Sequence, residues 1–266
     1  MATKLYDDYY ENLYEAICAI YTDSKDESRL DFDGVIIPKP QKKAYKLSIA
    51  GEFQDLLSYY LLDDVVFCDS VSCEGPYELG EVIVASDDIV IDCGAKIGLF
   101  SAIASNKGAI VYAFEPNKHI INEFLSETSA YNPNIHICEA ALSDKKEQIT
   151  FWGSDVNIGM GQIDKVSNGP RSTHNERMIV QATTLDEFVD EMNLPRIDFI
   201  KSDIEGAERY MLKGASHVLK EFSPKLAICT YHFPDDPKAL REIILDANPN
   251  YIIEQKPMKL YAHVPK

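Results

Sequence analysis

From residue 76 to the C-terminus, short apolar runs rich in β-branched residues alternate with segments in which apolar residues recur every three or four positions. The first pattern is typical of buried strands and the second of amphipathic helices. The predicted strands are residues 81–84, 89–93, 110–114, 135–140, 148–152, 178–182, 197–202, 226–231, 251–254 and 260–264. The predicted helices are residues 97–105, 118–130, 185–192, 207–220 and 237–247. This alternation predicts an α/β fold with a doubly wound, mostly parallel sheet.

The first 75 residues lack this alternation. Leu5, Tyr9, Leu13, Ile17 and Ile20 recur at helical spacing, and a weaker helical pattern follows further along. A chain of 266 residues is near the upper size for one hydrophobic core, so one main domain with an appendage is expected. We therefore predict a helical N-terminal cap, residues 1–75, and a Rossmann-like domain, residues 76–266. The cap sequence leaves two roles open: shaping an acceptor site, or mediating a homodimer.

The charge of the chain narrows the choice of partners. Its formal net charge is −17, with no basic stripe that would attract a phosphate backbone, so a nucleic-acid partner is not expected.

The six cysteines form no Cys-x-x-Cys pair, as in a reduced cytosolic protein. No stretch of eighteen apolar residues indicates a membrane span, and acids in the first 25 residues argue against a signal peptide. A cytoplasmic protein without a membrane partner is the expectation.

The stretch IDCGAKIGLF, residues 91–100, leads from a predicted strand into a predicted helix. In an open parallel sheet, ligands bind beyond such strand ends, and Gly94 and Gly98 leave room for a ligand to approach the backbone. A dinucleotide site needs G-x-G-x-x-G, but Lys96 stands where the middle glycine would be. This departure argues against an NAD-dependent oxidoreductase. The next strand ends in Glu115, whose carboxylate can accept hydrogen bonds from ribose hydroxyls, so a nucleoside cofactor is favoured.

Five segments in order resemble the FkbM family of S-adenosylmethionine-dependent methyltransferases. They are DCGAKIGLFS (92–101), AFEPN (113–117), AALSD (140–144), TLDEF (184–188) and IDFIKSDIEGAE (197–208). The resemblance implies the class I methyltransferase fold, with a seven-stranded sheet whose last strand is antiparallel. It also implies O-methyl transfer from S-adenosylmethionine to a hydroxyl of a sugar, polyketide or other small-molecule acceptor.

The resemblance assigns the cofactor to the strand ends. The residues expected there are Asp92, Gly94, Ala95, Lys96, Gly98, Glu115, Asn117, Ala141 and Asp203. Two departures from the family pattern are Lys96, where Asn is usual, and Ser202, where an apolar residue is common. The side chain of Lys96 has three alternatives: pairing with the cofactor carboxylate, obstructing the site, or pointing to solvent. Obstruction would leave a non-catalytic nucleoside-binding or interaction module with a methyltransferase fold.

Methyl transfer to a hydroxyl needs alignment and a general base. Asp203 and His232 follow neighbouring predicted strands and are the candidate catalytic residues. The segment 154–177 has no apolar period and is a candidate lid. Candidate acceptor contacts are Glu205, Trp152, Arg171 and His174. Asp203, Glu205 and His232 are also types that bind a divalent cation, but no spacing requires one and a metal site is not predicted.

Overall fold

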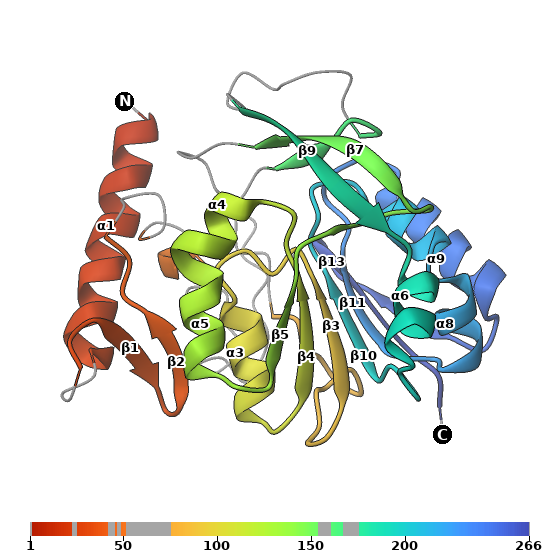
Figure 1. Cartoon of the computed structure of the whole chain (residues 1–266), viewed down its shortest axis with the longest axis horizontal. Helices are drawn as coiled ribbons and strands as arrows, with labels where there is room; N and C mark the ends of the chain where they lie inside the picture. The colour runs from red at the N-terminus through yellow and green to blue at the C-terminus, as the bar shows by residue number, and fades with distance from the viewer. Residues whose placement is uncertain are drawn as a thin grey trace.

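The large sheet has the class I methyltransferase topology. The computed structural model of the chain describes residues 2–22, 26–41, 46, 49–51, 76–153, 161–166 and 176–265. The strands are β3 (Ile89–Cys93), β4 (Ile110–Phe114), β5 (Ile135–Cys138), β10 (Phe199–Ser202), β11 (Lys225–Cys229), β12 (Ile252–Gln255) and β13 (Lys259–His263). Their spatial order is β12-β13-β11-β10-β3-β4-β5, and β13 runs antiparallel to both of its neighbours (Figure 1). The predicted fold class is confirmed.

Side chains alternate between the two faces of this sheet. On β3, Val90 belongs to one hydrophobic cluster and Ile89 and Ile91 to another, and Phe199 and Ile200 divide in the same way on β10. The first face is covered by α3 (Leu99–Asn106) and by the continuous helical segment α4 (Lys118–Ile120), η1 (Ile121–Leu125) and α5 (Ser126–Tyr131). The second is covered by α6 (Leu185–Met192), α7 (Glu208–Lys213), α8 (Ser216–Glu221) and α9 (Asp236–Ala247). Successive residues of the central strands are thus buried on alternate faces, which explains why short, continuous apolar runs marked these strands.

The predicted strand and helix bounds agree with the structure within two residues, with two exceptions. Residues 81–84 form only an isolated bridge between Leu79 and Val82, so the strand predicted there is wrong. The helix predicted over 207–220 is divided between α7 and α8 at Gly214. A Cβ on Gly214 would lie 2.1 Å from the backbone oxygen of Ser143, so a tight contact with the neighbouring loop occupies this position.

A second, four-stranded sheet was not foreseen as a separate unit. It contains β6 (Ala141–Leu142), β7 (Glu147–Gly153), β8 (Gln162–Ile163) and β9 (Glu176–Thr183), in the order β6-β9-β7-β8. In Figure 1, β7 and β9 cross the top of the molecule above β11 and β13. The side-chain amide of Gln162 donates to the backbone oxygen of Glu205 (2.8 Å), which ties this sheet to the loop after β10.

The N-terminal region is not entirely helical. After α1 (Ala2–Tyr21), the strands β1 (Arg29–Phe32) and β2 (Val35–Pro38) form an antiparallel hairpin, so the expectation of a helical cap is wrong for residues 29–38. Both turn residues, Asp33 and Gly34, have positive φ (55° and 94°), as a two-residue hairpin turn requires. Residues 52–75 lie outside the described part of the chain, and the proposed role of this region in a homodimer stays a prediction.

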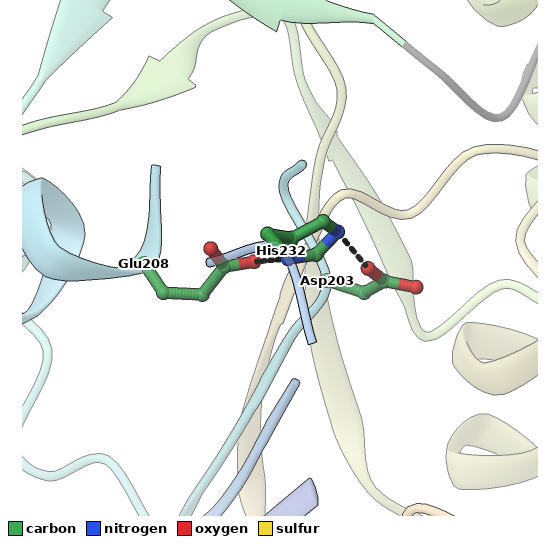
Figure 2. Close-up of side chains that lie close together, drawn as sticks. All are labelled: Asp203, Glu208 and His232. Atoms are coloured by element: carbon green, nitrogen blue, oxygen red, sulfur yellow. Dashed lines mark ion pairs between the residues drawn. The ribbon is translucent and has the colours of Figure 1, made fainter. Parts of the chain in front are cut away.

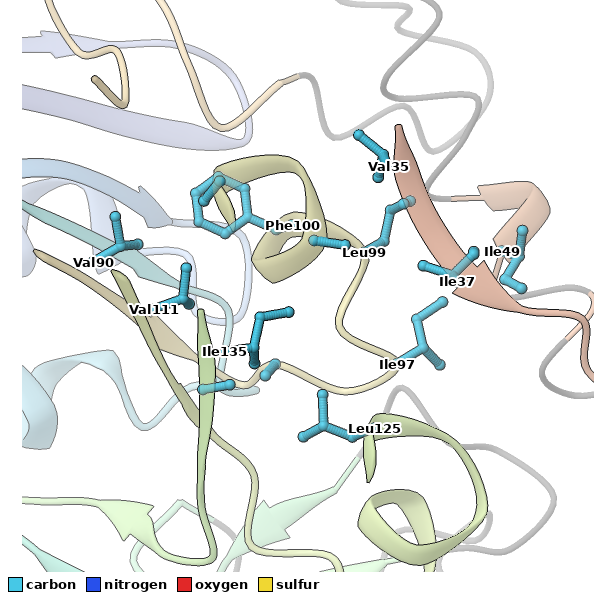
Figure 3. Close-up of a cluster of buried hydrophobic side chains, with 14 of the residues drawn as sticks. Val35, Ile37, Ile49, Val90, Ile97, Leu99, Phe100, Val111, Leu125 and Ile135 are labelled. Atoms are coloured by element: carbon cyan, nitrogen blue, oxygen red, sulfur yellow. The ribbon is translucent and has the colours of Figure 1, made fainter. Parts of the chain in front are cut away.

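The hairpin and the large domain share one hydrophobic core. Val35 and Ile37 of β2 pack with Ile97, Leu99 and Leu125 of the domain (Figure 3). The side-chain amide of Asn132 also donates to the backbone oxygen of Ile36 in β2 (2.7 Å). Burial of these aliphatic side chains stabilises the fold by about 1.5–3 kcal/mol for each fully buried side chain. The hairpin therefore completes the first face of the sheet.

Within the part of the chain that the structure describes, none of the helices combines the length and the apolar character that crossing a lipid bilayer requires.

Two glycines with positive φ provide a matched test of the contact between β3 and β10. A Cβ on Gly94 (φ 77°) would lie 2.1 Å from the backbone oxygen of Asp203, whereas one on Gly80 (φ 57°) would meet nothing within 4 Å. Both alanine substitutions carry the cost of a left-handed backbone, about 1–2 kcal/mol. We expect Gly94→Ala to lower the free energy of unfolding in urea by roughly 2 kcal/mol more than Gly80→Ala does, because only Gly94 adds a backbone clash. Equal losses of unfolding free energy in the two variants would contradict the close contact between Gly94 and the backbone of Asp203.

Candidate active site

A buried ion pair joins the carboxyl ends of β3 and β10. Lys201 lies directly opposite Asp92 in the parallel ladder, and its Nζ is 2.9 Å from Oδ1 of Asp92. The hydroxyl of Ser101, on α3, donates to Oδ2 of the same carboxylate (2.6 Å). The side chains of Asp92 and Lys201 are 0% and 6% exposed. Nζ of Lys201 also donates to the backbone oxygen of Gly94 (2.8 Å), so the pair fixes the turn that follows β3.

Lys201 keeps its charge despite its burial. Desolvation alone would lower the pKa of Lys201, but the adjacent Asp92 and the nearby Asp203 outweigh it and raise that pKa above its usual value. Asp92 was expected at the cofactor, and the structure instead engages both of its oxygens with Ser101 and Lys201.

The turn after β3 is held by backbone hydrogen bonds to β4. The amides of Gly94 and Ala95 both donate to the backbone oxygen of Phe114 (3.0 and 2.9 Å). The space that side chains at Gly94 and Gly98 would occupy is filled by the protein itself, and the approach of a ligand to this backbone stays a prediction. Beside Gly94 lies the backbone of Asp203, and a Cβ on Gly98 would lie 2.7 Å from the Leu125 side chain. Both glycines therefore permit close packing inside the protein.

Glu115 lies at the end of β4, next to this turn. It is 5% exposed, and its carboxylate accepts hydrogen bonds from the backbone amides of Lys96 (3.1 Å) and Asn117 (2.9 Å). Burial raises the pKa of Glu115 to about 7, although these two amides and Lys201 oppose the shift. Each oxygen accepts one backbone N–H and keeps a further lone pair for a ligand donor.

Three other expected cofactor residues are buried in the same region. Asn117 is 3% exposed and caps α4, because its Oδ1 accepts the amide of His119 (3.0 Å). Ala95 lies in the cluster on the first face of the sheet, and Ala141 lies in the small sheet's own cluster.

The charge of Lys96 acts on the acidic groups at the end of β10. Its side chain is partly buried, and its charge lowers the pKa values of both Asp203 and Glu205. Which of the three alternatives this side chain takes stays a prediction. Its backbone has φ 54°, a left-handed conformation that Asn, the usual residue of the family at this position, adopts more readily than Lys.

Beyond β10 and β11, His232 lies between carboxylates from both sides. Its Nε2 is 3.6 Å from Oδ1 of Asp203 and 3.6 Å from Oε2 of Glu205, and its Nδ1 is 3.4 Å from Oε1 of Glu208. Figure 2 shows the imidazole between Glu208 and Asp203, with one ring nitrogen directed at each. The structure therefore brings together the two candidate catalytic residues and Glu205. It adds Glu208, which was not among the candidate site residues.

The mutual proximity of these groups shifts their pKa values. Burial disfavours protonated His232, but Glu208, Asp203 and Glu205 outweigh it and raise its pKa to about 9. Burial and the charge of Asp203 raise the pKa of Glu205 to about 8. Burial would also raise the pKa of Asp203, but Lys201, His232 and two further lysines hold it below its ordinary value. Asp203 is thus ionised at neutral pH.

Two tyrosines that sequence reasoning missed orient Asp203. The hydroxyl of Tyr77 donates to its Oδ2 and that of Tyr231 to its Oδ1, both at 3.1 Å. The ammonium groups of Lys201 and Lys259 lie over the Tyr77 ring, 5.1 and 4.3 Å from its centroid. Tyr231 could have been found from its place at the end of a predicted strand. Tyr77 is 126 residues from Asp203, and no local pattern links them.

The remaining expected acceptor contacts are placed only in part. The indole N–H of Trp152, on β7, donates to Oδ1 of Asp164 within the segment that follows β8. Arg171 and His174 lie outside the described residues, as do positions 154–160 and 167–175 of the expected lid. Residues 161–166 of that segment form β8 and the turn after it, and β8 pairs with β7.

Comparison with known proteins gives a consistent group of relatives. The methyltransferase FkbM domain matches residues 92–251, more than half of the chain. Hexuronic acid methyltransferase AglP of Haloferax volcanii is 31% identical over 163 residues, which cover 60% of this chain and 63% of that protein. Methyltransferase 1 of Beauveria bassiana is 26% identical over 147 residues, or 48% of this chain and 58% of that protein.

Among solved structures, methyltransferase FkbM from Methylobacillus flagellatus KT resembles this chain with a TM-score of 0.51 and 18% identity. The similarity covers 95% of this chain and 58% of that one, and it shows that the two chains share a fold. The chain therefore spans less than two thirds of the length of each of these three relatives.

The buried pair can be tested against a more exposed pair on the neighbouring strand. Lys201→Met leaves the fully buried Asp92 without its partner, and we expect it to lower the free energy of unfolding by about 3–5 kcal/mol. Lys225→Met breaks an ion pair with Asp88 whose side chains are 25% and 13% exposed, and should cost about 1 kcal/mol. Chemical denaturation measures both. A double variant, Asp92→Asn with Lys201→Met, should recover part of the loss, and equally small losses for the two single variants would contradict the role of the pair.

The raised pKa of Glu115 predicts a pH-dependent stability. Below its unfolded value of 4.5 the carboxyl is protonated in both states, but between 4.5 and about 7 only the unfolded state loses its proton. The stability contributed by the neutral group is therefore lost as pH rises through this window, by about 3 kcal/mol in total. We expect the stability of Glu115→Gln relative to the wild type to increase by about this amount from pH 4.5 to 7.5.

Glu221→Gln makes the same chemical change at a side chain that is 50% exposed and serves as the control. Denaturation at several pH values gives the comparison. The raised pKa of Glu115 would be refuted if the difference in unfolding free energy between Glu115→Gln and the wild type stayed constant with pH. It would also be refuted if that difference changed with pH only as it does for Glu221→Gln.

Proposed function

Since the chain belongs to the FkbM family of S-adenosylmethionine-dependent methyltransferases, we propose that it methylates an oxygen atom of a sugar, with a hexuronic acid as the first acceptor to test. The single observation that carries this proposal is the close arrangement of two chemically different groups at one sheet edge. Glu115 offers a buried carboxylate beside the turn after β3, and the cluster around Asp203 and His232 follows the neighbouring strands β10 and β11. The relative from Haloferax volcanii supports a sugar acid among the small-molecule acceptors.

The residues present fit the cofactor in charge and hydrogen-bonding capacity. Glu115 retains lone pairs that can accept the two ribose hydroxyls, and the cationic Lys96 can pair with the methionine carboxylate. S-adenosylmethionine supplies an activated methyl group on a positively charged sulfur. In this proposal Asp92 does not touch the cofactor, because Lys201 and Ser101 engage both of its oxygens. Its role, with Gly94 and Gly98, is to hold the turn that presents Ala95 and Lys96.

On the acceptor side, Asp203 and His232 are the proposed catalytic residues. A sugar hydroxyl becomes a good nucleophile when a base accepts its proton, which typically contributes 10²- to 10⁴-fold in rate. The Asp203 carboxylate, whose pKa lies below its ordinary value, is the group proposed to receive that proton, and His232, whose Nε2 lies 3.6 Å from its Oδ1, is proposed to stabilise this carboxylate. The tyrosines Tyr77 and Tyr231 orient the Asp203 carboxylate. Glu205 is proposed to contact the acceptor.

The alternative of a non-catalytic module remains linked to Lys96, whose charge lies near Asp203 and Glu205. Calorimetric titration with S-adenosylmethionine, S-adenosylhomocysteine and NAD separates the two ideas. Binding of the first two supports the methyltransferase, and binding of none of the three would refute it.

The activity itself is tested with a glucuronic acid glycoside and the matching glucoside as acceptors. We expect a methylated product by mass spectrometry, formed faster from the uronic acid. Treatment of the product with mild base shows whether the carboxylate or a hydroxyl of the uronic acid was methylated, because a methyl ester is hydrolysed and a methyl ether is not. The double variant Asp203→Asn with His232→Ala should lose at least about 100-fold in rate while still binding S-adenosylmethionine. Asp235→Asn, at an exposed acid, is the control. Wild-type rates in the double variant would contradict the assigned roles.

A further inference from the structure

The imidazole of His232 is buried without hydrogen bonds. Its side chain is 4% exposed, and within the described residues neither ring nitrogen has a hydrogen-bond partner. Buried polar atoms in folded proteins are nearly always paired, so an unpaired ring calls for an explanation. The nearest carboxylate oxygens are 3.4 and 3.6 Å away, which is longer than a normal hydrogen bond to a ring nitrogen. The ring therefore lies among acceptors without being bonded to them.

Three carboxylates surround this ring. Asp203, Glu205 and Glu208 come from one short segment, and their side chains are 22%, 18% and 1% exposed. Oε2 of Glu208 has no hydrogen-bond partner within the described residues either. Carboxylates held close together repel one another unless positive charge lies near them, and here the imidazole and the ammonium groups of Lys201, Lys96 and Lys259 supply it. A divalent cation bound between the carboxylates would offset their repulsion directly.

We propose that Asp203, Glu205 and His232 bind a divalent metal ion, and that Glu208 orients the imidazole for it. Nε2 of His232 faces an oxygen of Asp203 and an oxygen of Glu205, each at 3.6 Å. Ligand atoms at right angles around one ion, with bonds of about 2.1 Å, lie about 3 Å apart, so both contacts to Nε2 must shorten when an ion binds. One ligand atom each from Asp203, Glu208 and His232 also lies within 4.8 Å of the others.

Glu208 occupies the position of a supporting group. Its Oε1 lies 3.4 Å from Nδ1, on the opposite side of the ring from the proposed ion (Figure 2). The same oxygen accepts the backbone amide of Ile204 (2.8 Å), so the carboxylate is fixed before any ion binds. Metal-binding histidines commonly donate their second ring N–H to such a carboxylate, which fixes the tautomer and the ring orientation. With an ion in place of the Nε2 proton, this arrangement would direct the lone pair of Nε2 toward the ion between Asp203 and Glu205.

The mixture of ligand atoms indicates the kind of ion. One imidazole nitrogen with two carboxylate oxygens suits Mn²⁺ or a similar first-row ion better than Mg²⁺ or Ca²⁺, which prefer oxygen ligands alone. A bound ion would lower the pKa of an acceptor hydroxyl that coordinates it. This use of the ion rests on the proposed function, but the binding of the ion does not.

The test is a titration of the full chain with Mn²⁺ alone, without S-adenosylmethionine or acceptor. Free Mn²⁺ is counted by electron paramagnetic resonance, and Mg²⁺ and Ca²⁺ are added as competitors. We expect one saturable Mn²⁺ site per chain that Mg²⁺ and Ca²⁺ displace only in large excess. Affinity should fall at least about 10-fold in Glu205→Gln and His232→Ala, and about 10- to 100-fold in Glu208→Gln, where the supporting carboxylate is lost.

Asp235→Asn is the matched control, because it removes one acid from the exposed surface of a chain with net charge −17. It should leave the stoichiometric site unchanged. Thermal unfolding by circular dichroism identifies any variant that fails to fold, and the nearly isosteric Glu205→Gln keeps the test decisive if His232→Ala does so. The proposal is overturned if no stoichiometric site exists, or if the Glu205 variant binds Mn²⁺ as the wild type does. Because binding of S-adenosylmethionine is measured separately, either proposal can fail without the other.

Discussion

The buried ion pair between Asp92 and Lys201 is the interaction on which the candidate site depends. It lies between adjacent central strands, β3 and β10, and Lys201 also binds the backbone oxygen of Gly94. Two charges with almost no solvent contact are stable only when their geometry is closely matched. The parallel register provides this match, because it places the two side chains directly opposite each other. The turn after β3 and the loop after β10 are thereby held in a fixed relation.

The ends of these two strands perform different tasks at the same sheet edge. On the β3 and β4 side, the turn and Glu115 provide a buried carboxylate and ordered backbone amides. On the β10 and β11 side, Asp203 and His232 belong to a cluster that concentrates negative charge. The backbone of Asp203 also fills the space beside Gly94, so the two sides are in direct contact. A change in either strand end should therefore be transmitted to the other through packing.

Sequence reasoning was most successful for features that repeat locally. The apolar runs identified all seven strands of the large sheet, and its central strands β3, β10 and β11 are buried on both faces. The edge strand β12 is mostly exposed. The hairpin at residues 29–38 was missed although its Asp33-Gly34 turn is a strong hairpin signal. Gly94 and Gly98 were recognised as special, but what fills the space beside them was not predicted. Their neighbours, Asp203 and Leu125, are distant in sequence, so no local pattern reveals what fills the space.

The sequence by itself determined the class of fold, the family and the positions of the strand ends, because periodic burial and short motifs are local properties of the chain. Only the tertiary structure decided which polar groups meet. It paired Asp92 with Lys201, brought Tyr77 to Asp203, and placed His232 among Asp203, Glu205 and Glu208. The physical reason is that charge and hydrogen-bond interactions act over a few ångströms in space. The distances between such groups depend on strand order and register, which the spacing of residues along the chain does not reveal.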